Sequence, residues 1–355
     1  MRALFFLNSF AGGGAEKVCL NLSAQLYKQN IESDYITVFE AAVDYDVPDH
    51  IRVFSLGIED KPLECIKIAE AVPRVNAFIA DNEYMLITAH LQPAQFLAAL
   101  SSVRNKCLYV IHHRVGDQHS WLRRICLRCF LHKKRIITVS KGVANELSST
   151  YGVKSENLVV IYNPCGITEL RAKLGLKSFH SRQYILVIGR LIKSKNPLSA
   201  LELYYRGRFY EHYDLIYLGR GACESELRRQ IAAYSLEEHV ILAGFQKNPE
   251  GWIMNASLVL SCSAQEGFSM ILAEALVCGV PVVSTDCPYG PREILVDELS
   301  EYLIDPENEF DKSISVITSA LESYPEITEK YYQRFDDRLI VQRYLDTWKK
   351  FFTAE

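Results

Sequence analysis

The sequence predicts an α/β protein built from two doubly wound domains with parallel sheets. Short apolar runs, typical of buried strands, alternate with segments of helical periodicity along both halves of the chain. The alternation breaks at residues 163–166, where an Asn-Pro-Cys-Gly sequence follows a strand-like run. We therefore expect one domain of residues 1–165, a second of residues 166–335, and a C-terminal helix within residues 336–355.

In the first half, the strand expected at residues 2–8 leads into a glycine-rich loop, and a helix with an apolar face is expected at residues 16–26. The other strands and the last helix expected here are residues 34–39, 51–54, 84–89, 107–111, 136–140 and 159–162, and residues 141–149. Strands that alternate with helices favour an open parallel sheet.

The second half repeats this pattern. Its strands are expected at residues 184–188, 214–218, 239–243, 258–261 and 280–285. One of its helices has apolar side chains on a single face, at positions 268, 271, 272, 275 and 276. Gly279 and Pro281 are suited to end that helix. The C-terminal part, residues 331–352, is expected to be helical.

The composition excludes several classes of protein. With 355 residues, 49% of them hydrophobic and 23% charged, the chain can bury two cores and is unlike a disordered protein. Ten cysteines without a paired framework indicate a reducing compartment, so we expect a cytoplasmic protein. Cys126 and Cys129 form a single CxxC without a second pair, which is weak evidence for a metal or redox site. No apolar run is long enough to span a membrane.

Two glutamates frame the start of the apolar helix. Glu266 lies in the loop that follows a strand, and Glu274 lies roughly 9 Å further along the helix axis. The free N–H groups at a helix start attract anions, phosphate above all. The pair can therefore hold two parts of one hydroxyl-rich ligand with a phosphate between them. Taken alone, the pattern fits a solvent-facing glutamate and a helix-dipole glutamate at least as well.

Two further loops carry phosphate-binding features. The loop with Gly13 and Gly14 joins a strand to a helix and lets the backbone approach a ligand, although a tight turn explains it equally well. Arg190 and Lys195 follow a strand of the second half, and cations converging there suit a diphosphate. The alternative for these two residues is solvated surface charge.

A pair of histidines, His112 and His113, follows the strand at 107–111. The carboxyl edge of a parallel sheet is where ligands bind, and an imidazole there can donate a hydrogen bond to a sugar hydroxyl or to a backbone carbonyl. Capping or packing histidines remain the alternative.

A basic segment lies between residues 102 and 141, which hold ten Lys and Arg against one acid, Asp117. Within it, residues 121–135 combine Trp121 and aliphatic residues with Arg123, Arg124 and Arg128. Such a helix can lie on an anionic membrane surface. A core helix with a solvated basic edge is the alternative, and a nucleic-acid surface is not expected because aromatic residues do not recur through the basic run.

These motifs together resemble family 4 retaining glycosyltransferases, and among them the bacterial lipopolysaccharide and lipid-linked oligosaccharide enzymes. The resemblance covers nearly the whole chain. Its motifs are Glu266 and Glu274 with Gly267 and Phe268 between them, and in chain order Gly13 to Glu16, His113, Asn163-Pro164, Gly189 to Leu191, Lys195-Asn196, Ser284 to Pro288 and Arg292-Glu293. One departure is Arg220, where the family usually has an acid between Gly219 and Gly221.

The resemblance implies the GT-B fold, with its two domains facing a central cleft and a last helix that returns to the first domain. It also implies sugar transfer from a nucleotide diphosphate to a glycan acceptor. It implies retention of configuration, UDP as the nucleotide, and no cofactor or metal. Roles in catalysis are implied for Glu266, Arg190, Lys195 and His113. Donor binding is implied for Gly13, Gly14, Gly189, Gln246, Gly267, Phe268, Ser269, Met270 and Glu274. Acceptor binding is expected for Glu16 and His112, and His112 also competes with His113 for the donor sugar.

Two alternatives remain at this point. One is a metal-dependent glycosyltransferase of another fold that uses Asp44 and Asp46, because paired aspartates bind divalent cations. The other is a membrane-bound scaffold that keeps the fold without activity. The partners expected under the main interpretation are a nucleotide sugar, a glycan or lipid-linked acceptor and the inner face of the cytoplasmic membrane, where the protein is expected to be peripheral.

Overall fold

The computed structural model describes residues 1–40, 44–59, 64–115 and 121–353, except for the side chains of residues 64, 65, 122 and 123. It divides into two compact units. The first unit comprises Met1–Cys165 with Phe335–Glu355, and the second comprises Gly166–Arg334. The first division falls where the Asn-Pro-Cys-Gly break was expected to end a domain, and the second lies one residue before the expected Phe335. Each unit has its own parallel sheet.

The sheet of the first unit has the order β3-β2-β1-β4-β5-β6-β7, and each neighbouring pair is parallel. Its strands are β1 (Arg2–Leu7), β2 (Glu32–Phe39), β3 (Arg52–Ile58), β4 (Tyr84–His90), β5 (Leu108–Ile111), β6 (Arg135–Thr138) and β7 (Leu158–Val160). All seven strands overlap the ranges expected from the sequence. The helices of this unit are α1 (Gly14–Tyr27), α2 (Glu64–Ala80), α3 (Ala94–Leu100), α4 (Trp121–Leu131), α5 (Lys141–Tyr151) and α13 (Asp337–Phe352).

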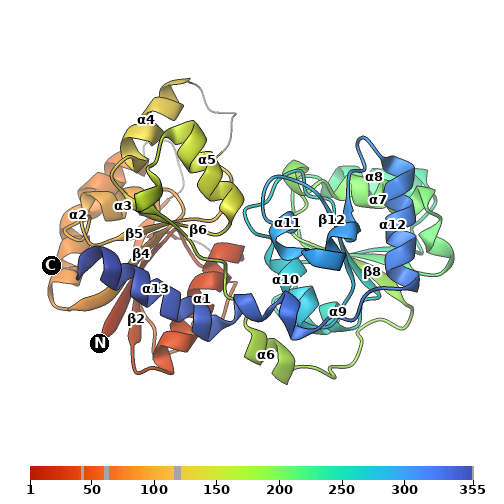
Figure 1. Cartoon of the computed structure of the whole chain (residues 1–355), viewed down its shortest axis with the longest axis horizontal. Helices are drawn as coiled ribbons and strands as arrows, with labels where there is room; N and C mark the ends of the chain where they lie inside the picture. Colours follow the sequence, from red (N-terminus) through yellow and green to blue (C-terminus); the bar gives the residue numbers. More distant parts are fainter. Residues whose placement is uncertain (41–43, 60–63, 116–120, 354–355) are drawn as a thin grey trace. The chain divides into compact units, whose positions relative to one another are not determined.

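The last helix, α13, belongs to the first unit. It packs against α1 and β4, and the Trp348 indole donates a hydrogen bond to the Lys106 carbonyl at 2.8 Å (Figure 1). The helix begins at Asp337 instead of near Tyr331, because the Asp336 carboxylate accepts hydrogen bonds from the N–H groups of Arg338 and Leu339. That side chain forms an N-cap that fixes where the helix starts. Periodicity alone had extended the helix too far towards the N-terminus.

The sheet of the second unit has the order β10-β9-β8-β11-β12-β13, again parallel throughout. Its strands are β8 (Tyr184–Ile188), β9 (Asp214–Leu218), β10 (Val240–Gly244), β11 (Leu258–Ser261), β12 (Val282–Thr285) and β13 (Leu303–Ile304). Its helices are α6 (Ile167–Ala172), α7 (Pro197–Arg206), α8 (Glu224–Ala233), α9 (Glu250–Met254), α10 (Met270–Val277), α11 (Pro291–Ile294) and α12 (Phe310–Glu322). Strand β13 was not expected from the sequence, because its two residues are too few to show a period.

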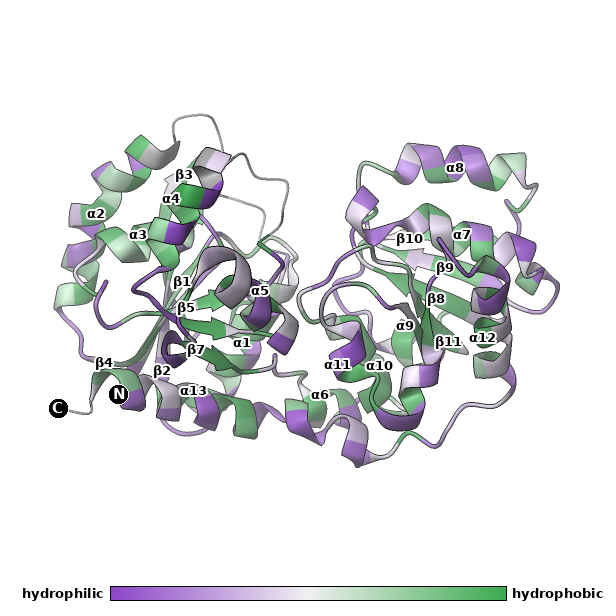
Figure 2. Ribbon diagram, turned by 45° about the horizontal axis from the view of Figure 1, so that its top comes forward, coloured by the Kyte–Doolittle hydropathy of each residue, from purple (hydrophilic) through white to green (hydrophobic). Residues whose placement is uncertain are grey.

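The central strands are buried along most of their length, because helices cover both faces of each sheet. Strands of this kind are nearly continuous apolar runs, as in β1 and β9 after their charged first residues. The outer helix α8 is mostly hydrophilic, whereas the strands are hydrophobic (Figure 2). The apolar runs of the sequence therefore predicted the strands well.

A buried carboxylate ties the amino ends of the first sheet together. The Asp34 side chain is inaccessible to solvent and accepts hydrogen bonds from Arg2 Nε at 3.0 Å, Arg52 Nη2 at 2.6 Å and the Tyr84 hydroxyl at 2.8 Å. These residues come from β1, β3 and β4, so one charge joins four strands. Burial by itself raises the pKa of Asp34, but the hydrogen bonds from Arg2, Arg52 and Tyr84 outweigh it and lower the pKa below its ordinary value.

This lowered pKa predicts loss of stability in acid. A carboxyl group with a folded-state pKa below its unfolded value of about 4 stabilises the fold fully above that value, and the contribution disappears as the pH falls through the folded-state pKa. We expect β2 to exchange its amide hydrogens faster in urea as the pH falls below about 4, after correction for intrinsic exchange rates. Asp34→Asn should reduce this pH dependence. Glu32→Gln, which removes the exposed acid beside Arg2, is the matched control and should preserve it.

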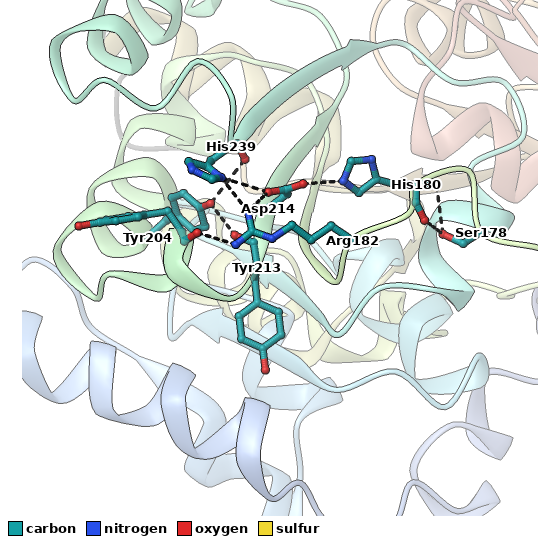
Figure 3. A network of polar contacts seen from close by, with 8 residues as sticks. Ser178, His180, Arg182, Tyr204, Tyr213, Asp214 and His239 are labelled. Carbon is teal, nitrogen blue, oxygen red and sulfur yellow. Dashed lines mark hydrogen bonds and ion pairs between the residues drawn. The ribbon is translucent and has the colours of Figure 1, made fainter.

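A second buried aspartate does the same for the second sheet. Asp214 begins β9, and its carboxylate contacts His180 Nε2 at 2.6 Å and accepts a hydrogen bond from Arg182 Nη1 at 2.7 Å (Figure 3). Arg182 Nη2 also donates to the Tyr210 carbonyl at 2.8 Å. His239, just before β10, lies against the same carboxylate. These contacts join the segments that enter β8, β9 and β10. They lie at the amino edge of the sheet and leave the carboxyl edge to the candidate site.

Candidate active site

The strand order predicts where a ligand fits in each unit. In the second unit β8 lies between β9 and β11, so successive connections leave it in opposite directions. In the first unit β1 takes the same position between β2 and β4. Ligands of doubly wound sheets bind outside the carboxyl ends of strands at such a switch point. The loops after β8 and β11 in the second unit, and after β1 and β4 in the first, are therefore the candidate positions.

Lys195 and Glu266 meet at the switch point of the second unit. Lys195 follows β8 and Glu266 follows β11, and Lys195 Nζ lies 2.5 Å from Glu266 Oε1. The Ser263 hydroxyl donates to the same oxygen at 2.7 Å. The Glu266 side chain is 9% exposed and that of Lys195 is 30% exposed, so this ion pair is only partly open to solvent. The sequence predicts both residues in the site, but it predicts that Lys195 converges with Arg190 and gives no sign of the pair with Glu266.

The loop after β12 fixes the backbone of Glu266. The Glu266 N–H donates to the Pro288 carbonyl at 3.0 Å, and the Tyr289 N–H donates to the Glu266 carbonyl at 3.1 Å. Gly290 continues this contact with a φ of 80°, and a Cβ there would lie 2.6 Å from the Phe268 carbonyl oxygen. Only glycine avoids both the strained conformation and that collision. The Ser284 to Glu293 motif of the sequence therefore acts as a brace behind Glu266.

Helix α10 begins beside this brace. Ser269 is its N-cap residue, with a φ of 73°, and its hydroxyl does not cap the helix. The Ser269 Oγ is buried and makes no hydrogen bond to any described residue. Phe268 is 2% exposed, so its ring packs in the core, and only its backbone is suited to the expected donor contact. Glu274 lies within the helix and is 4% exposed. Gly279, with a φ of 74°, follows the helix end as expected.

Three strand-end loops of this sheet interlock through their backbones. The Gly219 N–H donates to the Gly244 carbonyl at 2.8 Å, and the Leu191 N–H donates to the Arg220 carbonyl at 2.9 Å. A Cβ at Gly219 would lie 1.9 Å from the Gly189 oxygen, so the loops approach too closely for any side chain. Arg220 thus keeps a backbone role in this interlock, although it departs from the family pattern.

A small hollow lies at the carboxyl ends of β8 and β11. Its lining includes Gly189, Arg190, Lys195, Pro197, Cys262 and Ser263. Arg190 is exposed, so its guanidinium is accessible to an anion, whereas Lys195 is held by Glu266. The expected donor-binding Gln246 follows β10, and its amide donates to the Ala243 carbonyl at 2.8 Å. The second unit therefore places both cations and Glu266 at one edge.

In the first unit, Gly13 and Gly14 lie at the start of α1 as expected. Gly13 is the N-cap residue, and the Tyr45 hydroxyl donates to its carbonyl at 3.0 Å. Glu16 is 6% exposed, and its carboxylate lies against Gly13, where an added Cβ would be 2.1 Å from Oε2. Glu16 thus folds over the start of its own helix.

The two histidines after β5 have different surroundings. His112 is partly buried, and its Nε2 lies 2.7 Å from Nδ1 of the fully buried His90 at the end of β4. Burial, with the neighbouring His113, lowers the pKa of His112 to about 3, so its imidazole is neutral at physiological pH. His113 is exposed. His113 is therefore the more exposed of the two imidazoles.

Sequence reasoning missed four residues of these edges: Ser263, Thr88, His90 and Glu146. Ser263 precedes Glu266 by three residues in a strand-end loop, a spacing that could have indicated the contact. His90 ends a predicted strand as His112 follows one, but only the pairing of β4 with β5 makes them neighbours. Glu146 gave no comparable signal, because its partner Val115 follows another element, and Thr88 contacts His90 two residues further along the same strand.

The two units match the two domain models of one enzyme group. Residues 12–168 match the model described as Glycosyltransferase Family 4, and residues 167–337 match Glycosyl transferases group 1. The chain belongs to the family 4-like glycosyltransferases of GT-B fold. Both expectations drawn from the motifs, the family and the fold, are thereby confirmed. Neither alternative, a transferase of another fold or an inactive scaffold, gains support from these matches.

Relatives of this glycosyltransferase include bacterial enzymes. It is 26% identical over 317 residues to the Campylobacter jejuni N-acetylgalactosamine-N,N'-diacetylbacillosaminyl-diphospho-undecaprenol 4-alpha-N-acetylgalactosaminyltransferase, covering 86% of each chain. It is also 26% identical to the Salmonella typhimurium lipopolysaccharide 1,6-galactosyltransferase over half of each chain. Among solved structures, S. aureus TarM with UDP has a TM-score of 0.77 at 14% identity and is matched over 99% of this chain and 100% of its own. This last likeness concerns the fold.

The described residues of the glycosyltransferase were also searched for metal-binding groups and for membrane-spanning helices. Within it, no group of three or more His, Cys, Asp or Glu side chains is arranged to hold a metal ion. None of the helices described combines the length and apolarity needed to cross a bilayer. Asp44 and Asp46, the residues of the metal-dependent alternative, are among the residues that were searched.

Proposed function

We propose that this glycosyltransferase moves a hexose or N-acetylhexosamine from a UDP-sugar to a hydroxyl of a glycan or lipid-linked acceptor in bacterial surface polysaccharide synthesis. The observation that carries the proposal is the Lys195–Glu266 pair at the switch point of the second sheet, beside the start of α10. Relatives that act on lipopolysaccharide and on an undecaprenol-linked glycan support the acceptor class. A related fold solved with UDP and glucose, HepE of Anabaena, supports the donor class.

The proposed chemistry depends on stabilising the departing diphosphate. Negative charge grows on the bridging oxygen as the sugar leaves, and Arg190 and Lys195 at this edge can neutralise it. The backbone N–H groups at the start of α10 and the Ser269 hydroxyl add hydrogen-bond donors. Glu274 is assigned to the ribose hydroxyls and Glu266 to the donor sugar. Retention of configuration then fits attack by the acceptor assisted by the departing phosphate.

Donor binding tests this proposal first. The melting temperature of the protein is measured with UDP-glucose, UDP-galactose, UDP-N-acetylglucosamine and UDP-N-acetylgalactosamine. The donor among them should raise it, because a ligand that binds the folded state stabilises it by mass action. The corresponding GDP- and ADP-sugars are the controls. Absence of binding by every nucleotide sugar in calorimetry would favour the inactive scaffold.

Metal independence is the second part of the proposal. Two basic side chains at the diphosphate position do the work that a bound divalent cation does in other transferases. We expect the rate of UDP release from the donor to be unchanged by EDTA and by added Mg²⁺ or Mn²⁺. If EDTA abolished activity and Mn²⁺ restored it, the result would support the metal-dependent alternative that uses Asp44 and Asp46.

We further propose that α4 rests on the anionic inner face of the cytoplasmic membrane. Trp121 is 69% exposed and Ile125 51% exposed, and Leu100 on α3 is 51% exposed. Arg124 and Arg128 are exposed on the same helix, which mixes hydrophilic and hydrophobic residues (Figure 2). The side chain of Arg123 lies outside the described residues. An apolar strip with cations beside it suits lipid headgroups.

Flotation with liposomes tests this surface. Replacing Arg123, Arg124 and Arg128 together by glutamine should weaken binding to anionic vesicles, by about 1 kcal/mol for each charge near the surface. Binding should also fall at high salt, whereas UDP affinity should not change. Replacing Arg208, Arg228 and Arg229, which form exposed ion pairs in the second unit, is the control of equal charge. Equal and negligible binding of the unmodified protein to anionic and neutral vesicles would contradict the proposal.

A further inference from the structure

A buried glutamate of the first unit contacts the segment that carries His113. Glu146 lies on α5, and its side chain is 4% exposed. Its Oε2 accepts a hydrogen bond from the Val115 N–H at 3.1 Å, and its Oε1 lies 3.5 Å from Arg114 Nε. A buried carboxylate is costly unless charged and hydrogen-bonded groups compensate it. The two residues directly after His113 supply part of this compensation.

The helix that carries Glu146 is itself firmly placed. The Ser140 hydroxyl caps its start by accepting a hydrogen bond from the Val143 N–H at 3.3 Å, and Gly152 ends it in the left-handed conformation. Val143, Leu147 and Tyr151 bury one face of the helix, and Glu146 lies next to Leu147 on that face. A charge at a buried position of a rigid helix can fix a neighbouring loop precisely.

The same segment is also held at its other end. His112, directly before His113, contacts His90 through their ring nitrogens, and the other His90 nitrogen, Nε2, lies 3.0 Å from the Thr88 hydroxyl. The two imidazole rings stack with centroids 5.0 Å apart. His90 and Thr88 belong to β4, the neighbour of β5 in the sheet. His113 therefore lies, exposed, between one anchor on β4 and one on α5.

We propose that Glu146 is a positioning residue for sugar transfer, which holds the main chain after His113 so that the exposed imidazole keeps one orientation at the carboxyl edge of β5. The inference rests on the proposed function, because it assigns His113 to the reaction. It makes a distinctive claim: Glu146 acts on the reaction only through His113. Misplacement of a reacting group by about 1 Å can lower a rate about 100-fold.

A double-mutant cycle on the full chain tests the claim. The probe is UDP release, with water as acceptor, from the UDP-sugar that gives the largest thermal shift in the panel. We expect Glu146→Ala to lower kcat about 10- to 100-fold, with KM and the Kd for UDP within about 2-fold of the parent. In a His113→Ala background, Glu146→Ala should cause less than about a 2-fold further loss, because coupled residues are not additive.

A conservative variant separates positioning from folding. Glu146→Gln keeps an oxygen that can accept from the Val115 N–H, so it should recover kcat to within about 5-fold of the parent. Hydrogen exchange should be faster at residues 112–115 in Glu146→Ala and close to normal in Glu146→Gln. Glu156→Ala, which removes an exposed acid that pairs with Lys154 shortly after α5, is the matched control and should change neither measurement.

Three outcomes would overturn the inference: parental kcat in Glu146→Ala, an undiminished effect of Glu146→Ala in the His113→Ala background, or a loss in Glu146→Gln as large as in Glu146→Ala while residues 112–115 remain protected. If Glu146→Ala does not fold, the comparison of Glu146→Gln with the parent, with and without His113→Ala, decides the same question. Failure of the proposed function is distinct, since it would appear as a parent protein that neither binds nor cleaves any UDP-sugar.

Discussion

Replacing Lys195 by alanine is expected to lower turnover about 100-fold or more, and Arg190→Ala should have an effect of the same order. Removal of one preorganised group that stabilises developing negative charge costs other enzymes about 100- to 1,000-fold in kcat. Both residues line the hollow at the carboxyl ends of β8 and β11. The measurement is the rate of UDP release from saturating donor.

The structure adds a further expectation for Lys195. Its amine is held by Glu266 in the ligand-free chain, so donor binding has to share or exchange this contact. Lys195→Ala also removes the charge partner of a carboxylate that is 9% exposed, so both donor affinity and turnover should fall. Lys193→Ala, an exposed cation in the same turn, is the control. Near-normal turnover in both Arg190→Ala and Lys195→Ala would remove these cations from the mechanism.

The second large effect is expected at Glu274. A carboxylate that accepts hydrogen bonds from two ribose hydroxyls contributes roughly 1.5–3 kcal/mol, so Glu274→Ala should raise the Kd for UDP about 10- to 100-fold. Glu274 is buried within α10 and 4% exposed, so Glu274→Gln, which keeps its shape, should be measured alongside. Isothermal calorimetry with UDP gives the affinity directly.

Glu266 should respond differently. Glu266→Ala removes the assigned contact to the donor sugar, so turnover should fall while the Kd for UDP, which has no sugar, changes little. Glu226→Ala removes an exposed acid from the surface helix α8 and is the control for both glutamates. If Glu266→Ala and Glu274→Ala both bound UDP and turned over donor like the parent, the pair would have a structural role only.

The sequence by itself determined the architecture and pointed to the carboxyl edge of each sheet as the place of the candidate site. Strands buried on both faces are mostly apolar, so β1 and β9 were readable as apolar runs after their polar first residues, Arg2 and Asp214. Because parallel strands all end at the same edge, the sequence predicted Lys195, Glu266 and His113 at the carboxyl edges of the sheets, and their loops follow β8, β11 and β5. Glycines such as Gly219 lie in loops that pack too closely for a side chain.

The tertiary structure alone decided which of these residues touch. Lys195 and Glu266 are 71 residues apart, and they meet because β8 pairs with β11. The lateral order of strands depends on how the crossover helices pack, and hydrophobic periodicity carries no information about it. The same holds for the His90 contact with His112 and for the buried Glu146, whose partner Val115 lies on another element. Periodicity shows that a position is buried, whereas the partner that makes a buried charge tolerable is found only in the folded chain.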